Sequence, residues 1–127
     1  YLLRVPPNTQ TAHEGIAFAL NFGMNIMTSM GMNTSLIRAA KANIFLSPIF
    51  RDALAAITGA SIELYDTDGS VGAARGAGLG SNIYKNADET FGTLKKIKSV
   101  EPAISEKPAY QDAYNNWLQG LKTIIQA

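Results

Sequence analysis

A segment of small and polar residues could bind a ligand between a predicted strand and a predicted helix. Its residues are Ala39, Ala40, Lys41, Ala42 and Asn43. Ligands of open parallel sheets bind outside the carboxyl ends of the strands, which is where this segment is expected to lie. Small side chains let a ligand reach the backbone there, and the amide of Asn43 offers both a donor and an acceptor. The alternative, which the residues alone favour, is an ordinary turn in which Asn43 bonds its own backbone.

Three glycines spaced four residues apart give a second candidate. Gly72, Gly76 and Gly80 leave one face of a predicted helix at 71–84 almost without side chains. A glycine inside a helix costs about 0.5–1 kcal/mol relative to alanine, so a close approach by backbone or ligand should offset the loss. Either this helix packs tightly on a sheet, or its start and bare face border a flat ligand such as a nucleotide base.

The remaining reactive side chains point to structural roles. Asp66 and Asp68 could act as paired carboxylates in acid–base catalysis or metal binding, but turn and cap duty before Gly69 explains them more simply. His13 is the single histidine, and at a predicted helix start it is expected to be solvated or to cap. The chain has no cysteine, which excludes disulfides, a thiol nucleophile and cysteine-bound metal. We therefore assign no catalytic and no metal-ligating residue.

Composition narrows the class of protein. The 127 residues are enough for one domain with a modest core, and 46% of them are hydrophobic, as in globular proteins. Eleven basic and ten acidic side chains give a net charge of +1, which removes the electrostatic argument for a nucleic-acid partner or a membrane surface. No apolar run approaches the roughly 18 residues of a spanning helix, and the start at Tyr1 resembles no signal peptide. Because the first residue is not methionine, we expect a processed chain or a piece of a longer one.

Helices and strands alternate along the first two thirds of the chain. Helices are predicted from Thr9 or Thr11 to Met30, from Pro48 to a stop at Gly59 and at 71–84, and strands at 34–38 and 61–65. Alternating elements with short connections imply an α/β fold with parallel strands and crossover helices. Two strands are too few for a stable open sheet, so further strands should come from Tyr1–Val5, a partner chain or missing sequence. After these elements we expect a short helix at 87–96 and a loop at 97–105.

The last segment predicts an additional C-terminal amphipathic helix. Its apolar stripe comprises Tyr110, Tyr114, Trp117, Leu118, Leu121, Ile124 and Ile125. The stripe could face a partner, but amphipathic helices more often pack on their own domain, and that is the interpretation we adopt.

Three segments, taken in order, carry a resemblance to one family of enzymes: Glu14–Leu20, residues 37–59 and Gly69–Gly78. Together they resemble the FGGY carbohydrate kinases. The first is similar to the helix that opens the nucleotide half of the family's C-terminal domain. The second, with its Ser-Pro-Ile-Phe sequence, resembles the strand, glycine-rich loop and helix that follow, and the third resembles the family's Gly-Ala-Ala helix. Within the family, residues 42–50 look most like xylulokinases.

The resemblance implies part of an actin-like (ribonuclease H-like) ATPase lobe, in a protein with two lobes and ATP held between them. In the family, the loop that matches Ala39–Asn43 contacts the nucleotide, and the glycine–alanine helix that contains Gly72 borders its adenosine end. The resemblance therefore implies that the cofactor-binding residues are Ala39, Ala40, Lys41, Ala42, Asn43 and Gly72. Ala39, Ala40 and Lys41 stand near the position of the family's three glycines, with one residue of length difference. Asn43 matches an asparagine of the glycerol kinase branch.

Nothing in the chain matches the family's sugar-binding residues or its catalytic aspartate. The resemblance thus implies that residues 1–127 are the C-terminal, nucleotide-side segment of an incomplete lobe, inactive when alone. The complete enzyme is expected to be cytoplasmic. It would transfer the γ-phosphoryl group of ATP, with Mg²⁺, to D-xylulose or a related pentulose bound by the missing part.

A free-standing, non-catalytic interaction module with the same fold is the alternative function. It would bind a partner through the helix at 110–117 or through the glycine face. Neither interpretation gives a role to nucleic acid or to a membrane. An incomplete lobe also leaves a sheet edge unpaired, through which the chain is expected to form a homodimer or to aggregate.

Overall fold

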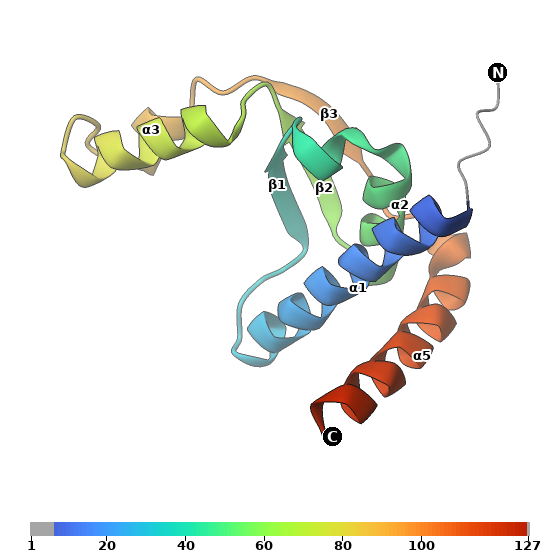
Figure 1. The fold of residues 1–127 in the computed structure, drawn as a ribbon. Coiled ribbons are helices and arrows are strands. Elements are labelled where there is room, and N and C mark those ends of the chain that lie inside the picture. The colour runs from blue at the N-terminus through green and yellow to red at the C-terminus, as the bar shows by residue number, and fades with distance from the viewer. Residues whose placement is uncertain (1–6, 127) are drawn as a thin grey trace, which may run out of the picture.

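Residues 7–126 are described by a computed structural model, in which helices lie on one side of a small sheet and beyond one end of it (Figure 1). The helices are α1 (Pro7–Ser29), α2 (Pro48–Thr58), α3 (Gly69–Gly80), α4 (Ala87–Phe91) and α5 (Lys107–Ile125), with short 3₁₀ turns η1 (Asn43–Leu46) and η2 (Ile104–Glu106). The strands are β1 (Leu36–Ala40), β2 (Ser61–Tyr65) and β3 (Lys96–Val100). The candidate strand Tyr1–Val5 lies outside the described residues.

The strands follow the order β1-β2-β3 in the sheet. β1 and β2 are parallel, with Leu36 opposite Ser61, and α2 is the crossover between them. This confirms the predicted strand–helix–strand unit and the α/β class. β1 begins at Leu36 rather than at Thr34 because the preceding residues make a turn. The side chain of Asn33 accepts the Ser35 N–H at 3.0 Å, and the Thr34 hydroxyl bonds that of Thr28 at 2.8 Å.

The third strand corrects the sequence prediction, which placed a loop at 97–105. β3 pairs antiparallel with β2, so the sheet is mixed. Its Lys96 and Lys98 are typical of an exposed edge strand, on which charged side chains replace the apolar alternation of a half-buried one. The helix before it is also shorter than predicted, since α4 ends at Phe91 and Gly92–Leu94 turn toward the strand.

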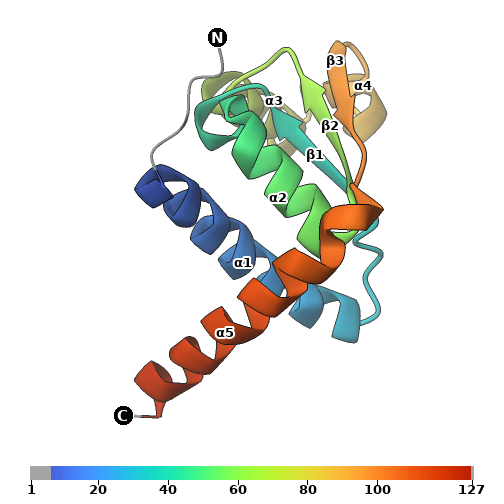
Figure 2. The ribbon, with the colours of Figure 1, turned by 90° about the vertical axis from the view of Figure 1, so that its right-hand side faces the viewer.

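Three helices lie on one side of the sheet (Figure 2). α2 lies against the strands, and α1 and α5 pack on α2. In the main core, Phe50 and Leu54 of α2 meet Ile62 and Leu64 of β2 and Ala17 of α1. Each of these side chains is at most 1% exposed. Burial of apolar surface at about 25 cal/mol per Å² makes this cluster the main source of stability for the sheet.

α5 packs its aromatic residues on α1, which confirms the prediction that its stripe is internal. Tyr114 is buried, and its ring meets that of Phe18 edge to face at a centroid distance of 5.7 Å. Trp117 stacks on Tyr114 at 5.9 Å. The packing does not extend to the end of the helix, because Ile124 and Ile125 are 77% and 71% exposed.

The ends of α2 follow the predicted signals. Ser47 caps the helix, with its Oγ accepting the N–H of Phe50 at 3.3 Å, and Pro48 occupies the first turn. Gly59 ends the helix at φ +72°, in the left-handed region that favours glycine.

Two other helix boundaries differ from the prediction. α1 begins at Pro7 rather than at Thr9 or Thr11, because proline suits the first helical position. α3 ends at Gly80 rather than near 84, because the chain turns back and the N–H groups of Ile83 and Tyr84 donate to the carbonyl of Gly78. None of the helices within residues 7–126 is both long enough and apolar enough to cross a membrane.

Candidate functional site

A pocket of about 600 Å³ lies at the carboxyl ends of β1 and β2. One wall is formed by the sheet and the other by the first turn of α3 and by α4. The lining residues are Arg38, Ala39, Ala40, Tyr65, Thr67, Asp68, Gly72, Ala87, Asp88, Phe91, Gly92 and Leu94. Most of this surface is apolar, with a few polar groups, which is the usual character of a small-molecule site.

The structure brings together half of the residues predicted to bind a cofactor. Ala39, Ala40 and Gly72 line the pocket, although they come from β1 and α3. Lys41, Ala42 and Asn43 are not among the lining residues. Instead, the Lys41 N–H continues the ladder between β1 and β2 by donating to the Tyr65 carbonyl at 2.9 Å.

The chain after β1 folds into the short 3₁₀ turn η1. Asn43 begins η1 with φ +50°, a left-handed conformation that asparagine tolerates better than most residues. Arg51 of α2 holds this turn from inside the protein: its Nη1 donates to the Phe45 carbonyl at 2.6 Å, and the residue is only 6% exposed. Sequence reasoning missed Arg51, because nothing in its spacing on α2 distinguishes it from a surface arginine.

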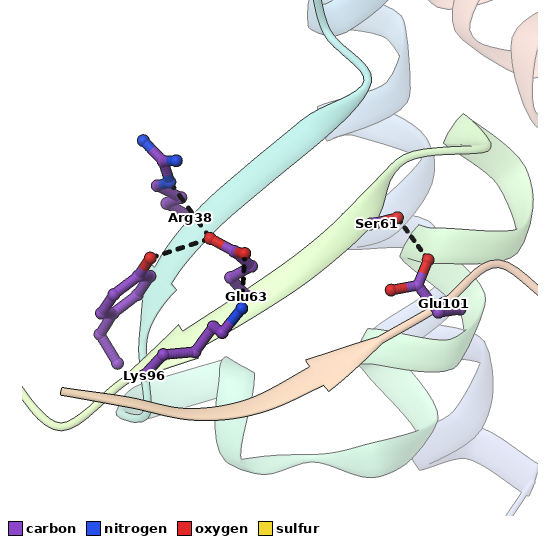
Figure 3. Close-up of polar contacts among 6 residues, drawn as sticks. Arg38, Ser61, Glu63, Lys96 and Glu101 are labelled. Atoms are coloured by element: carbon purple, nitrogen blue, oxygen red, sulfur yellow. Dashed lines mark hydrogen bonds and ion pairs between the residues drawn. The ribbon is translucent and has the colours of Figure 1, made fainter.

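Glu63 links all three strands beside the pocket (Figure 3). Its carboxylate accepts Arg38 Nε of β1 at 3.2 Å, Lys96 Nζ of β3 at 3.0 Å and the Tyr65 hydroxyl at 2.8 Å. The hydrogen bond from Lys96 contributes most, followed by those from Tyr65 and Arg38. Together they lower the pKa of Glu63 to about 2. The same contacts raise the pKa of Arg38 and of Lys96.

Sequence reasoning also missed this Glu63 cluster. The register of the two strands indicates the pairing of Arg38 with Glu63. Each is the third residue of its strand, and the two are opposite each other in the parallel pair. The contribution of Lys96 could not be foreseen without β3.

The far wall of the pocket is built by α3 and α4. Asn86 caps α4 by accepting the Glu89 N–H at 2.8 Å. Arg75 of α3 ties the two helices together, with Nη1 donating to the Thr90 carbonyl and to Thr93 Oγ1 at 2.9 Å. Thr90 is fully buried by this arrangement.

The bare face of α3 does not pack on the sheet. A Cβ atom added at Gly72, Gly76 or Gly80 would meet no atom within 4 Å. Tight packing on the sheet is therefore the wrong explanation for these glycines among the described residues. The close approach that does occur lies elsewhere on the helix, where the ring of Tyr84 covers Gly78.

The other candidate side chains have structural roles. Asp68 caps α3, with Oδ1 accepting the Val71 N–H at 2.9 Å and the Ser70 hydroxyl at 2.8 Å, and these bonds lower the pKa of Asp68. Its cap role is confirmed, although it also lines the pocket. His13 lies 3.4 Å from the hydroxyl of Ser47, outside the pocket lining. Residues 7–126 contain no group of three or more His, Cys, Asp or Glu side chains placed to hold a metal ion.

The fold is similar to part of a solved sugar kinase. The crystal structure of xylulose kinase from Rhodospirillum rubrum matches 90% of this chain with a TM-score of 0.69 and 16% sequence identity. The match covers 24% of the kinase chain, so the present chain spans about a quarter of that protein. No family model matches the sequence, and no curated protein matches it. At this level of identity the likeness establishes a fold: an α/β unit with a small mixed sheet, of the kind found within a kinase domain.

Proposed function

We propose that this chain is the nucleotide-side segment of the C-terminal domain of an FGGY carbohydrate kinase, most similar to xylulokinases. In this proposal the sheet and helices are part of an actin-like lobe. The fold shared with xylulose kinase supports it. The observation that carries it is the pocket at the strand ends, because it is lined together by Ala39, Ala40 and Gly72, for which the family resemblance implies nucleotide contact.

The pocket walls suit a nucleoside. Tyr65 and Phe91 supply aromatic surface and Leu94 and Ala40 supply aliphatic surface, against which a purine can lie. The first turn of α3 contributes Gly72, whose missing side chain leaves the wall open. A volume of about 600 Å³ lies within the range of small-molecule sites.

The reaction belongs to the complete enzyme. ATP held in this pocket would transfer its γ-phosphoryl group to a hydroxyl of D-xylulose or a related pentulose, which is bound outside this chain. An aspartate outside this chain would accept the proton of that hydroxyl, and Mg²⁺ would neutralise the phosphates. We assign neither the metal nor a catalytic role to any residue between 7 and 126. In this proposal the enzyme is cytoplasmic, and the chain alone does not phosphorylate sugar.

Two glycine variants test the proposal. Gly72→Ala places a methyl group in the pocket wall, whereas Gly76→Ala places one on the same helix, away from the pocket lining. Both should fold, since neither methyl meets another atom. We expect Gly72→Ala to weaken ATP binding by at least about fivefold, the equivalent of about 1 kcal/mol for an overfilled site. Gly76→Ala should leave the affinity unchanged.

The measurement is a titration of isotope-labelled chain with ATP up to millimolar concentration, followed by NMR. Shifts should map to the pocket residues and saturate. Absence of saturable binding, or an equal response of the two variants, would refute the proposal.

The interaction module remains a second candidate, and one observation favours it. An apolar groove of about 760 Å³ runs between α1 and β1, lined by Leu20, Met24, Met27 and Leu36 among others. The helix at 110–117, by contrast, uses its aromatic residues inside the protein. A module that binds through the groove needs no nucleotide, so the same titration separates the two functions.

A further inference from the structure

The two walls of the pocket carry opposite charge. Arg38 stands on the sheet side, with 68% of its side chain exposed. Asp68 and Asp88 stand on the side of α3 and α4. A ligand with negative charge at one end is therefore attracted by Arg38 and repelled by Asp68 and Asp88. This difference favours one orientation of the ligand in the pocket.

The Glu63 cluster holds Arg38 in place without neutralising that wall. Arg38 uses its Nε–H for Glu63, and its terminal nitrogens point away from the carboxylate (Figure 3). Because Lys96 shares the same carboxylate, two cations face one anion. The sheet wall keeps a net positive charge, and a guanidinium that is already ordered loses less conformational freedom when it binds a ligand.

The acidic wall stays charged as well. The ionised carboxylate of Asp68 accepts hydrogen bonds from the Ser70 hydroxyl and the Val71 N–H. Asp88 lies exposed in the first turn of α4. Phosphate oxygens placed between them would be repelled, whereas ribose hydroxyls can donate hydrogen bonds to a carboxylate there.

We propose that Arg38 is a binding residue for the phosphate chain of the nucleotide. The inference rests on the proposed function, because it assigns one more contact in the same pocket; the placement of the nucleoside toward α3 is what the family resemblance already implies. Guanidinium groups suit phosphate because they offer several N–H donors in one plane.

Arg38→Met and Lys96→Met form a matched pair of variants. Each variant removes one positively charged side chain that is bonded to Glu63. Arg38 lines the pocket, whereas Lys96 is not among its lining residues in the part of the chain that the structure describes. Adenosine, AMP and ADP are titrated into the unmodified chain and into both variants, with circular dichroism to confirm the fold. We expect Arg38→Met to weaken ADP binding about tenfold, as for loss of a charge-assisted hydrogen bond, and adenosine binding less than about twofold. Lys96→Met should change either affinity less than about twofold.

The outcomes separate the two proposals. If the unmodified chain binds none of the three ligands, the proposed function is wrong, and the assignment of Arg38 is wrong with it. If it binds them but Arg38→Met weakens adenosine as much as ADP, or no more than Lys96→Met does, the pocket holds nucleotide and the assignment of Arg38 is overturned. A selective loss of ADP and AMP affinity in Arg38→Met alone supports the assignment.

Discussion

Adding a methyl group at Gly78 should destabilise α3, although alanine is the better helix former. A Cβ built there would lie 2.7 and 2.9 Å from two ring carbons of Tyr84, closer than real side chains approach. The Tyr84 backbone is held beside α3, because its N–H is bonded to the Gly78 carbonyl at 3.2 Å, so the ring must rotate off Gly78 and lose that contact to make room. Replacing glycine by alanine in a helix gains about 0.5–1 kcal/mol, and overpacking costs about 1–3 kcal/mol. We expect a net loss of about 1–2 kcal/mol.

Gly76→Ala is the matched control for this prediction. Its Cβ meets nothing within 4 Å, so the variant should gain the full helix preference of about 0.5–1 kcal/mol. Amide hydrogen exchange along α3 measures both changes locally, even where α3 opens without the core. In the double variant Gly78→Ala/Tyr84→Ala the added methyl should become favourable. If Gly78→Ala protects α3 as well as Gly76→Ala does, the proposed conflict with Tyr84 is wrong.

Three further predictions follow from the sheet and its edges. The pKa of Glu63 is lowered from 4.5 to about 2, so its contacts stabilise the fold fully above pH 4.5 and lose this effect as the pH falls toward about 2. Glu63→Gln should flatten that part of a plot of unfolding midpoint against pH. Ser47→Ala removes the α2 cap and should lower the free energy of unfolding, measured with urea, by about 1 kcal/mol. Ser47→Asp should keep most of the stabilisation by the cap, and equal losses in the two variants would contradict the cap role. The outer edge of β1 has no neighbouring strand among residues 7–126, so the chain should associate as concentration rises in sedimentation experiments; Leu36→Lys should reduce this, and a monomer at all concentrations would refute the homodimer expectation.

Local signals explain which parts of the fold could be predicted. Ser47 and Pro48 start α2, Gly59 stops it, and β2 was predicted with the bounds that the structure has, because each of these signals acts within a few residues. β3 was missed because an edge strand with two lysines lacks the apolar alternation on which strand prediction depends.

Half of the residues expected to bind a cofactor line the candidate pocket. Ala39 and Ala40 lie at the carboxyl end of β1 and Gly72 in the first turn of α3, which are places that the order of elements along the chain indicates. The α4 wall and the Glu63 cluster depend on which distant segments meet, and that is decided by β3 pairing beside β2. Arg38 and Lys96 are far apart in sequence, and only the completed sheet places both on one carboxylate.

The route of the chain between β2 and β3 makes the helical wall of the pocket a separable part. β2 and β3 are antiparallel neighbours, yet residues 66–95 leave the sheet between them, and the Asp66 N–H donates to the Lys95 carbonyl at 2.8 Å where the excursion returns. Both ends of the excursion are thus fixed side by side, as in a hairpin with a very long loop (Figure 1). Lengthening such a loop costs little, since closure entropy grows only slowly with its length. The sheet could therefore keep its strands through insertions, deletions or even replacement of α3 and α4 by a tight turn, so the helical wall of the pocket could diverge during evolution while the sheet stayed the same.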